Sequence, residues 1–181
     1  MLRLAALIGV VSMAVMGCGG KAEMEEQQLR QMEDRIRSWP SLEDTQRAVT
    51  AVSVEMAAAL SARVPGFEFV HSGKPEPGSC GDYDRNRIGA VGVTIQALFV
   101  DRPIPDDAWS GVYDSVQVIA ASYGFTDTLV LADKPGHHIV RFFDGTGNEL
   151  TVGHVKATVI SGKTGCRLKA DSGTASPTTT R

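Results

Sequence analysis

The acidic segment GDYDRNRIG has the residue types of a calcium-binding loop. Asp82, Asp84 and Asn86 occupy alternate positions, as the first three oxygen ligands of such a loop do. Arg87 stands where the sharp turn requires glycine, and Val93 stands where a bidentate glutamate is required. We therefore expect no calcium site in this segment.

Four histidines could contribute to a metal site if the fold gathered them: His71, His137, His138 and His154. Adjacent residues of a strand point to opposite faces, so His137 and His138 cannot both turn toward one site. At most three imidazoles could then converge, as a zinc site would require. We interpret all four as ordinary histidines of strands and turns, and we predict no metal ligand among them.

Sequence motifs of catalysis are absent from the chain. It contains neither G-x-S-x-G nor H-E-x-x-H. The segment DGTGNE lacks the strand-to-helix context and the third glycine of a phosphate-binding loop, and we predict a hairpin turn there. We expect no catalytic residue and no cofactor. The alternative is an envelope hydrolase whose site is assembled from dispersed residues, with Asp82, Asp84 and His138 as its candidates.

The first residues of the chain have the pattern of a secretory signal. Arg3 precedes an uncharged segment, residues 4–16, that ends at Gly17 and Cys18. The segment is too short to span a bilayer, which takes about 20 apolar residues. Its end resembles the lipobox of bacterial lipoproteins, in which lipid is attached to the cysteine sulfur and a peptidase cuts before that residue. This resemblance implies an extracytoplasmic protein that is anchored to the cell membrane by lipid on Cys18.

The charge balance agrees with an anchor made of lipid. Lys and Arg number 18 against 21 Asp and Glu, which gives a net charge of −3. An acidic chain is a poor partner for nucleic acid, and anionic headgroups do not attract it. We therefore expect that acyl chains hold the protein at the membrane.

The chain has three cysteines, a number that agrees with export if one of them carries lipid and the other two form a disulfide. If Cys18 carries lipid, Cys80 and Cys166 remain, and we predict a disulfide between them because such bonds persist in an oxidising compartment. In the alternative interpretation, Cys80 is a free nucleophile activated by a histidine such as His71.

The hydrophobic pattern predicts three helices. The first covers residues 22–39 and stops at Pro40, the second begins after an N-cap at Ser41 and stops at Pro65, and the third runs from Asp106 to Gly124. Period-two segments predict strands at 67–71, 91–99, 125–131, 138–143, 150–159 and 165–168, with a loop at 72–89. In the strand at 91–99 we expect the odd-numbered residues to share one face.

This order of elements predicts an α+β fold. We expect a mostly antiparallel sheet with helices packed on one face, preceded by two N-terminal helices that also pack on the sheet. The predicted organisation is a removed signal peptide (1–17), a lipidated leader (18–21), a single domain (22–169) and a disordered Thr- and Ser-rich tail (170–181).

Several stretches of the chain resemble the LppA-type lipoprotein family of mycobacteria. They are Gly17-Cys18, LEDTQRAV, Cys80 after a Gly- and Pro-rich loop, DDAW, and TGCRL at residues 164–168. The resemblance implies an exported, lipid-anchored α+β protein, with Cys18 as the lipid site and Cys80 bridged to Cys166. It supplies no established activity. We accordingly expect a non-catalytic binding or interaction domain whose partner is an envelope protein or ligand.

Overall fold

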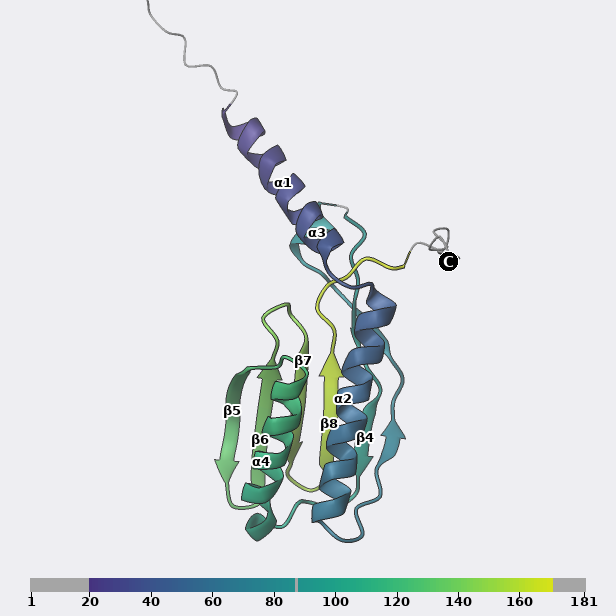
Figure 1. Ribbon diagram of the computed structural model, residues 1–181, viewed down its shortest axis with the longest axis vertical. Coiled ribbons are helices and arrows are strands. Elements are labelled where there is room, and N and C mark those ends of the chain that lie inside the picture. Colours follow the sequence, from purple (N-terminus) through teal and green to yellow (C-terminus); the bar gives the residue numbers. More distant parts are fainter. Residues whose placement is uncertain (1–19, 87, 171–181) are drawn as a thin grey trace, which may run out of the picture.

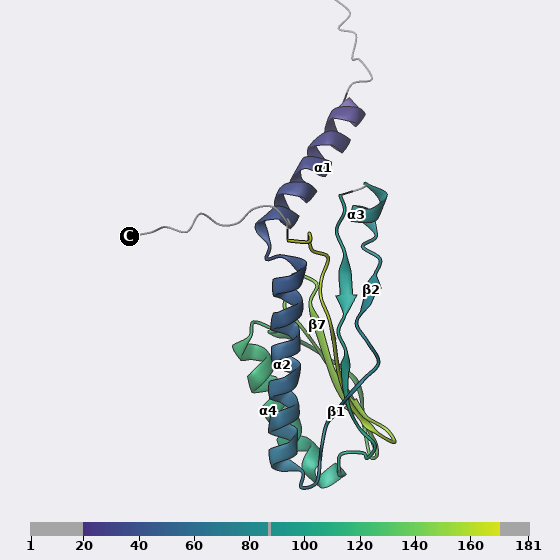
Figure 2. The same ribbon diagram turned by 90° about the vertical axis from the view of Figure 1, so that its right-hand side faces the viewer.

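The computed structural model describes residues 20–86 and 88–170, and its body has two layers (Figures 1 and 2). Two helices cover one face of an antiparallel sheet, so the predicted α+β fold is confirmed. The predicted signal peptide, Cys18 and residues 171–181 lie outside the described residues. The elements are α1 (Gly20–Ser38), α2 (Leu42–Arg63), β1 (Val70–Ser72), β2 (Glu76–Gly78), α3 (Asp82–Arg85), β3 (Gly92–Thr94), β4 (Ala97–Val100), α4 (Asp106–Ser122), β5 (Asp127–Lys134), β6 (His137–Phe143), β7 (Glu149–His154) and β8 (Thr158–Lys163).

The sheet is antiparallel throughout. Six strands follow the order β1-β4-β8-β7-β6-β5, while β2 pairs with β3, and β3 joins β8 at a single register pair, Thr94 with Lys163. Short turns connect β5 to β6 and β6 to β7, as the predicted hairpin turns require. The region from Glu76 to Thr94 therefore forms an arm that is attached to the end of β8, an interior strand of the main sheet.

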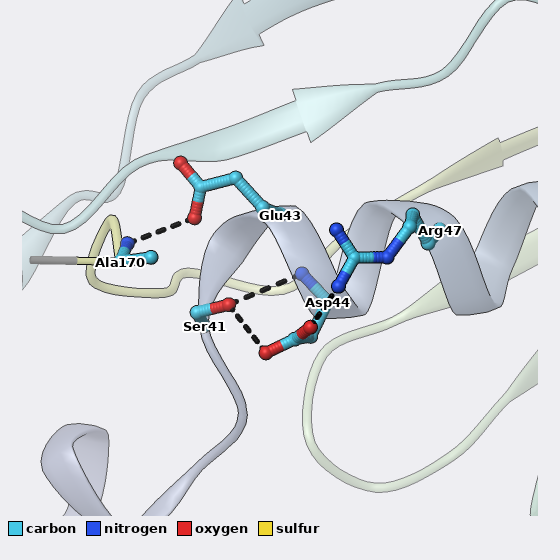
Figure 3. Close-up of polar contacts among 5 residues, drawn as sticks. All are labelled: Ser41, Glu43, Asp44, Arg47 and Ala170. Carbon is cyan, nitrogen blue, oxygen red and sulfur yellow. Dashed lines mark hydrogen bonds and ion pairs between the residues drawn. The ribbon is translucent and has the colours of Figure 1, made fainter. Parts of the chain in front are cut away.

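Helix α2 begins at the predicted cap. The Ser41 hydroxyl accepts a hydrogen bond from the Asp44 backbone N–H at 3.1 Å and donates to the Asp44 carboxylate at 2.7 Å (Figure 3). Nearby, the Ala170 N–H donates to Glu43 at 2.8 Å, which lowers the pKa of Glu43 and ties the end of the described chain to α2.

The core lies between the sheet and the helices α2 and α4. Its members on α2 and α4 include Val49, Val52, Met56, Leu60, Val112 and Val116, and those on the sheet include Val140, Phe142, Leu150, Val152 and Ile160. Gly162 permits close packing of α2 on β8, because a Cβ at this position would meet Val49 Cγ1 at 2.8 Å.

Helix α1 differs from the prediction, because it projects away from the sheet (Figures 1 and 2). Near its C-terminal end, Ile36 is buried in a second, smaller cluster with Cys80 and Ala90. The structure contains a disulfide between Cys80 and Cys166, which joins the arm to the segment after β8. None of the described helices is long and apolar enough to cross a membrane.

Four strand and loop predictions were wrong in detail. The predicted strand at 91–99 is interrupted at Ile95 and Gln96, which reverses its phase and places Leu98 and Val100 in the core. The predicted strand at 150–159 contains the turn between β7 and β8. The predicted loop at 72–89 contains β2 and α3, and the predicted strand at 165–168 makes one isolated bridge, between Val91 and Arg167. Pairing of β3 and β4 with the distant β8 decided the break in the strand at 91–99, whereas a short hairpin turn decided the break in the strand at 150–159.

Candidate metal centre

A transverse row of polar residues crosses three neighbouring strands on the face that the helices cover. Asp133 of β5 lies opposite His138 of β6, and His138 lies opposite His154 of β7. Directly opposed residues in antiparallel strands share a face. The first turn of α4 passes over this row, and Trp109 stacks on the His138 ring with 4.7 Å between the ring centroids. His138 and His154 are therefore enclosed between the sheet and α4, whereas Asp133 is exposed at the edge of the row.

Three residues converge at this place: Asp106 of α4, His138 and His154. Each offers one possible metal-ligand atom, and these atoms all lie within 4.8 Å of one another. His138 Nε2 lies 3.4 Å from Asp106 Oδ1. Zn–N and Zn–O bonds are about 2.0–2.2 Å long, so an ion at the centre would require only a modest contraction of this group.

The His138 ring is held in one tautomer. Its Nδ1 lies 2.7 Å from Asp133 Oδ1, and because a carboxylate accepts, the proton is on Nδ1. In the neutral form of this ring, Nε2 carries the lone pair, and this atom has no hydrogen-bond partner among the described residues. Histidines that bind a metal through one ring nitrogen usually donate the N–H of the other to a carboxylate, as His138 does to Asp133.

His154 is more deeply buried, with 2% of its surface exposed. Neither of its ring nitrogens has a hydrogen-bond partner within the described part of the chain. Burial lowers the pKa of His154, so its imidazole is neutral at physiological pH and has a lone pair to offer. Leaving buried polar atoms without partners is unfavourable, and a bound cation would be held by Nε2 of His138 and one ring nitrogen of His154.

Asp106 supplies the anionic group. The Gly136 N–H donates to Asp106 Oδ1 at 2.8 Å, and this bond is the main reason that the pKa of Asp106 is lowered. The Asp106 side chain is 50% exposed, so solvent can reach one side of the site. Two neutral imidazoles and one carboxylate form a donor set suited to zinc and related divalent transition metals, with one position left for water.

The other residues singled out in the sequence lie elsewhere. His71 is exposed on β1 opposite Leu98, and His137 lies opposite Lys134. Asp84 accepts from the Ser79 hydroxyl and the Cys80 N–H at the start of α3, which lowers its pKa. Asp82 and Asp84 belong to the arm, whereas His138 lies beside the β5–β6 turn at the opposite end of the sheet (Figure 1). The structure thus does not bring the three residues of the hydrolase alternative together.

Our interpretation of the histidines missed the contribution of Asp106. The alignment of Asp133, His138 and His154, however, follows from the positions of two hairpin turns in the sequence. The predicted turn at Asp144–Gly147 places His138 opposite His154, and the turn between β5 and β6, at Pro135–Gly136, places Asp133 opposite His138. Asp106 could not be found in this way, since its position depends on how α4 packs on the sheet.

Together the fold and the site define a two-layer α+β protein in which Asp106, His138 and His154 converge under the first turn of α4. The profile of the LppA family, described as a lipoprotein confined to pathogenic Mycobacterium, matches residues 19–170, and the chain belongs to this family.

Two crystal structures share the fold. The lipoprotein LppA from Mycobacterium tuberculosis is 17% identical, with a TM-score of 0.62 over 89% of this chain and 100% of that chain. A protein of the DUF4853 family from Actinomyces odontolyticus is 13% identical, with a TM-score of 0.50 over 80% of this chain and 77% of that chain. No curated protein sequence matches the chain.

Proposed function

We propose that this lipoprotein is exported, is anchored to the outer face of the cell membrane by lipid on Cys18, and binds a divalent transition-metal ion in its folded body. The metal ligands are Asp106, His138 and His154. The observation that supports this function is the convergence of three ligand atoms within 4.8 Å, two of them from buried imidazoles. Zinc is the first candidate because it accepts this donor set in tetrahedral geometry.

Binding is favoured over catalysis by what the neighbouring groups already do. A zinc hydrolase needs a general base within hydrogen-bond reach of the metal-bound water. The other carboxylate at the site, Asp133, is bonded to His138 Nδ1, where it orients a ligand. The exposed side of Asp106 gives the ion a route in and out, as a store or carrier of metal requires.

The test is a titration of Zn²⁺ into the purified protein by isothermal titration calorimetry, with Asp106→Asn as the main variant. This change removes the anionic ligand, keeps the side-chain shape and affects a half-exposed residue, so folding should be preserved. Loss of a residue that only hydrogen-bonds to a metal ligand weakens metal binding about 10- to 100-fold. Loss of a ligand itself should weaken Zn²⁺ binding by at least the same factor.

Asp107→Asn is the matched control. Asp107 is the next residue of the same helical turn and lies outside the ligand group, so its variant should bind Zn²⁺ as the natural chain does. Asp133→Asn should have an intermediate effect, because it acts through His138. Equal affinity of the Asp106 and Asp107 variants, or no saturable binding by the natural chain, would refute the proposal.

A further inference from the structure

A second candidate site lies at the other end of α4. A cavity of about 450 Å³ is bounded by the N-terminal half of α2, the segment that follows α4 and the β6–β7 turn. Its buried lining is half apolar and half polar, and consists of Val49, Val52 and Phe125 with Thr45, Asn148 and Arg167. Small-molecule sites typically combine apolar walls with a few placed polar groups. Neither the fold nor the proposed metal ligands require this cavity.

Arg167 is the notable polar group of this lining, because only 1% of its surface is exposed. Its two terminal nitrogens donate four hydrogen bonds of 2.7–3.2 Å. The acceptors are Thr146 O, Thr146 Oγ1, Asn148 Oδ1 and Cys166 O. All of these acceptors are neutral. Its guanidinium lies over the Trp39 ring, 4.7 Å from the ring centroid, and Asp144 attracts it from the β6–β7 turn without forming an ion pair with it. Burial is nevertheless the main influence and lowers the pKa of Arg167, because these contacts only partly replace the water lost.

Two polar atoms of this lining have no hydrogen-bond partner among the described residues. They are Arg167 Nε and Thr45 Oγ1, and both are buried. The Nε–H can only donate, and the threonine hydroxyl can donate or accept. One acceptor group with two oxygen atoms could satisfy both.

The two acidic residues of the lining are already engaged. Asp44 pairs with Arg47 and accepts from Ser41 (Figure 3). Asp144 accepts from the backbone N–H groups and side chains of Thr146 and Asn148 within its own turn. Since donors surround each of these carboxylates, the charge of Arg167 is the one left for a ligand.

We propose that this cavity binds a small molecule that joins a carboxylate to an apolar chain. The carboxylate accepts from Arg167 Nε and Thr45 Oγ1, and the chain packs against Val49, Val52 and Phe125. At roughly 30 Å³ for each water-sized group, the cavity has room for about 15 non-hydrogen atoms. Octanoate, with ten, is therefore a suitable probe.

The experiment is an NMR titration of the oxidised chain from residue 18 onward, with Cys18→Ser to avoid acylation, so that every described residue is retained. Octanoate should shift the signals of Thr45, Val49 and Asn148 in a saturable manner below about 1 mM, as expected for a ligand of this size. Octanol and octylamine have the same chain with other head groups, and they should bind at least tenfold more weakly.

Three variants separate the head-group contact from the chain contact. Thr45→Val, which keeps the side-chain shape, should weaken octanoate at least about fivefold, because a hydrogen bond to a charged group is lost. Ala48→Trp, at an exposed position that lines the cavity, should block it, whereas Ala51→Trp, exposed on the same helix outside the lining, should not.

Equal affinities for octanoate, octanol and octylamine would overturn the proposal, and so would octanoate shifts located away from the cavity or the absence of saturable binding. None of these results depends on Zn²⁺, so failure here is distinguishable from failure of the metal site.

Discussion

Removal of the disulfide should cost this protein much of its stability. The double variant Cys80→Ala/Cys166→Ala opens a loop between residues 86 positions apart in the sequence. In the chain-entropy treatment, closing a loop of this length removes unfolded-state freedom worth about 4 to 5 kcal/mol at 25 °C. The free energy of unfolding of a domain is commonly about 5–15 kcal/mol, so the loss is a large part of the total.

Urea unfolding followed by circular dichroism measures this loss. With a slope of about 2 kcal/mol per molar urea, the midpoint should fall by about 2 M. The free energy, and not the midpoint alone, should be compared, because an uncrosslinked unfolded chain exposes more surface and raises the slope. Cys18→Ser is the control, since it removes the third cysteine and leaves the bridge. If the free energy of unfolding of the double variant decreased by less than about 1 kcal/mol, the argument would be refuted.

The arm at residues 76–94 should respond first to loss of the bridge. It is attached to β8 and the segment after it by the pair Thr94–Lys163, the bridge Val91–Arg167 and two hydrogen bonds between Val93 and Thr164, besides the disulfide. Amide hydrogen exchange in the arm should therefore quicken before exchange in β6 and β7 does. Uniform quickening over both regions would contradict this order.

Four further predictions concern single positions. Ser41→Ala should lower the free energy of unfolding by about 1 kcal/mol in urea titrations, because α2 loses its cap. Gly162→Ala should lower the free energy of unfolding by about 1–3 kcal/mol, because the added Cβ pushes α2 away from β8. Gly78→Ala should change this free energy little, because its Cβ would meet its nearest atom at 3.9 Å. The lowered pKa of His154 means that the unfolded chain binds more protons, so metal-free protein should lose stability as pH falls below about 6.5, and His154→Leu should reduce this dependence. Mass spectrometry of membrane-extracted protein should find an acylated N-terminal peptide that begins at Cys18; an unmodified Cys18 would exclude the lipid anchor.

Much of the fold could be predicted because its signals are local. Ser41 and Pro65 delimit α2, the acidic pair at Asp106 starts α4, and Gly124, with a φ of 85°, ends it. The strand errors at Ile95 and at the β7–β8 turn have a different origin. At Ile95 the alternation of apolar residues continues through the break, and only the pairing of β3 and β4 with the distant β8 shows where each strand stops. At residues 155–157 the alternation continues through the short turn of the β7–β8 hairpin.

The sequence by itself determined the limits of α2 and α4 and the antiparallel hairpins, because turn chemistry and alternation act over a few residues. Only the tertiary structure decided that the first turn of α4 lies over His138 and His154, and that Arg167 is buried beside α2 without an ion pair among the described residues. These arrangements depend on how helices and sheet bury their apolar faces against each other. The energy of that packing is shared among residues far apart in the chain, so no local pattern encodes it.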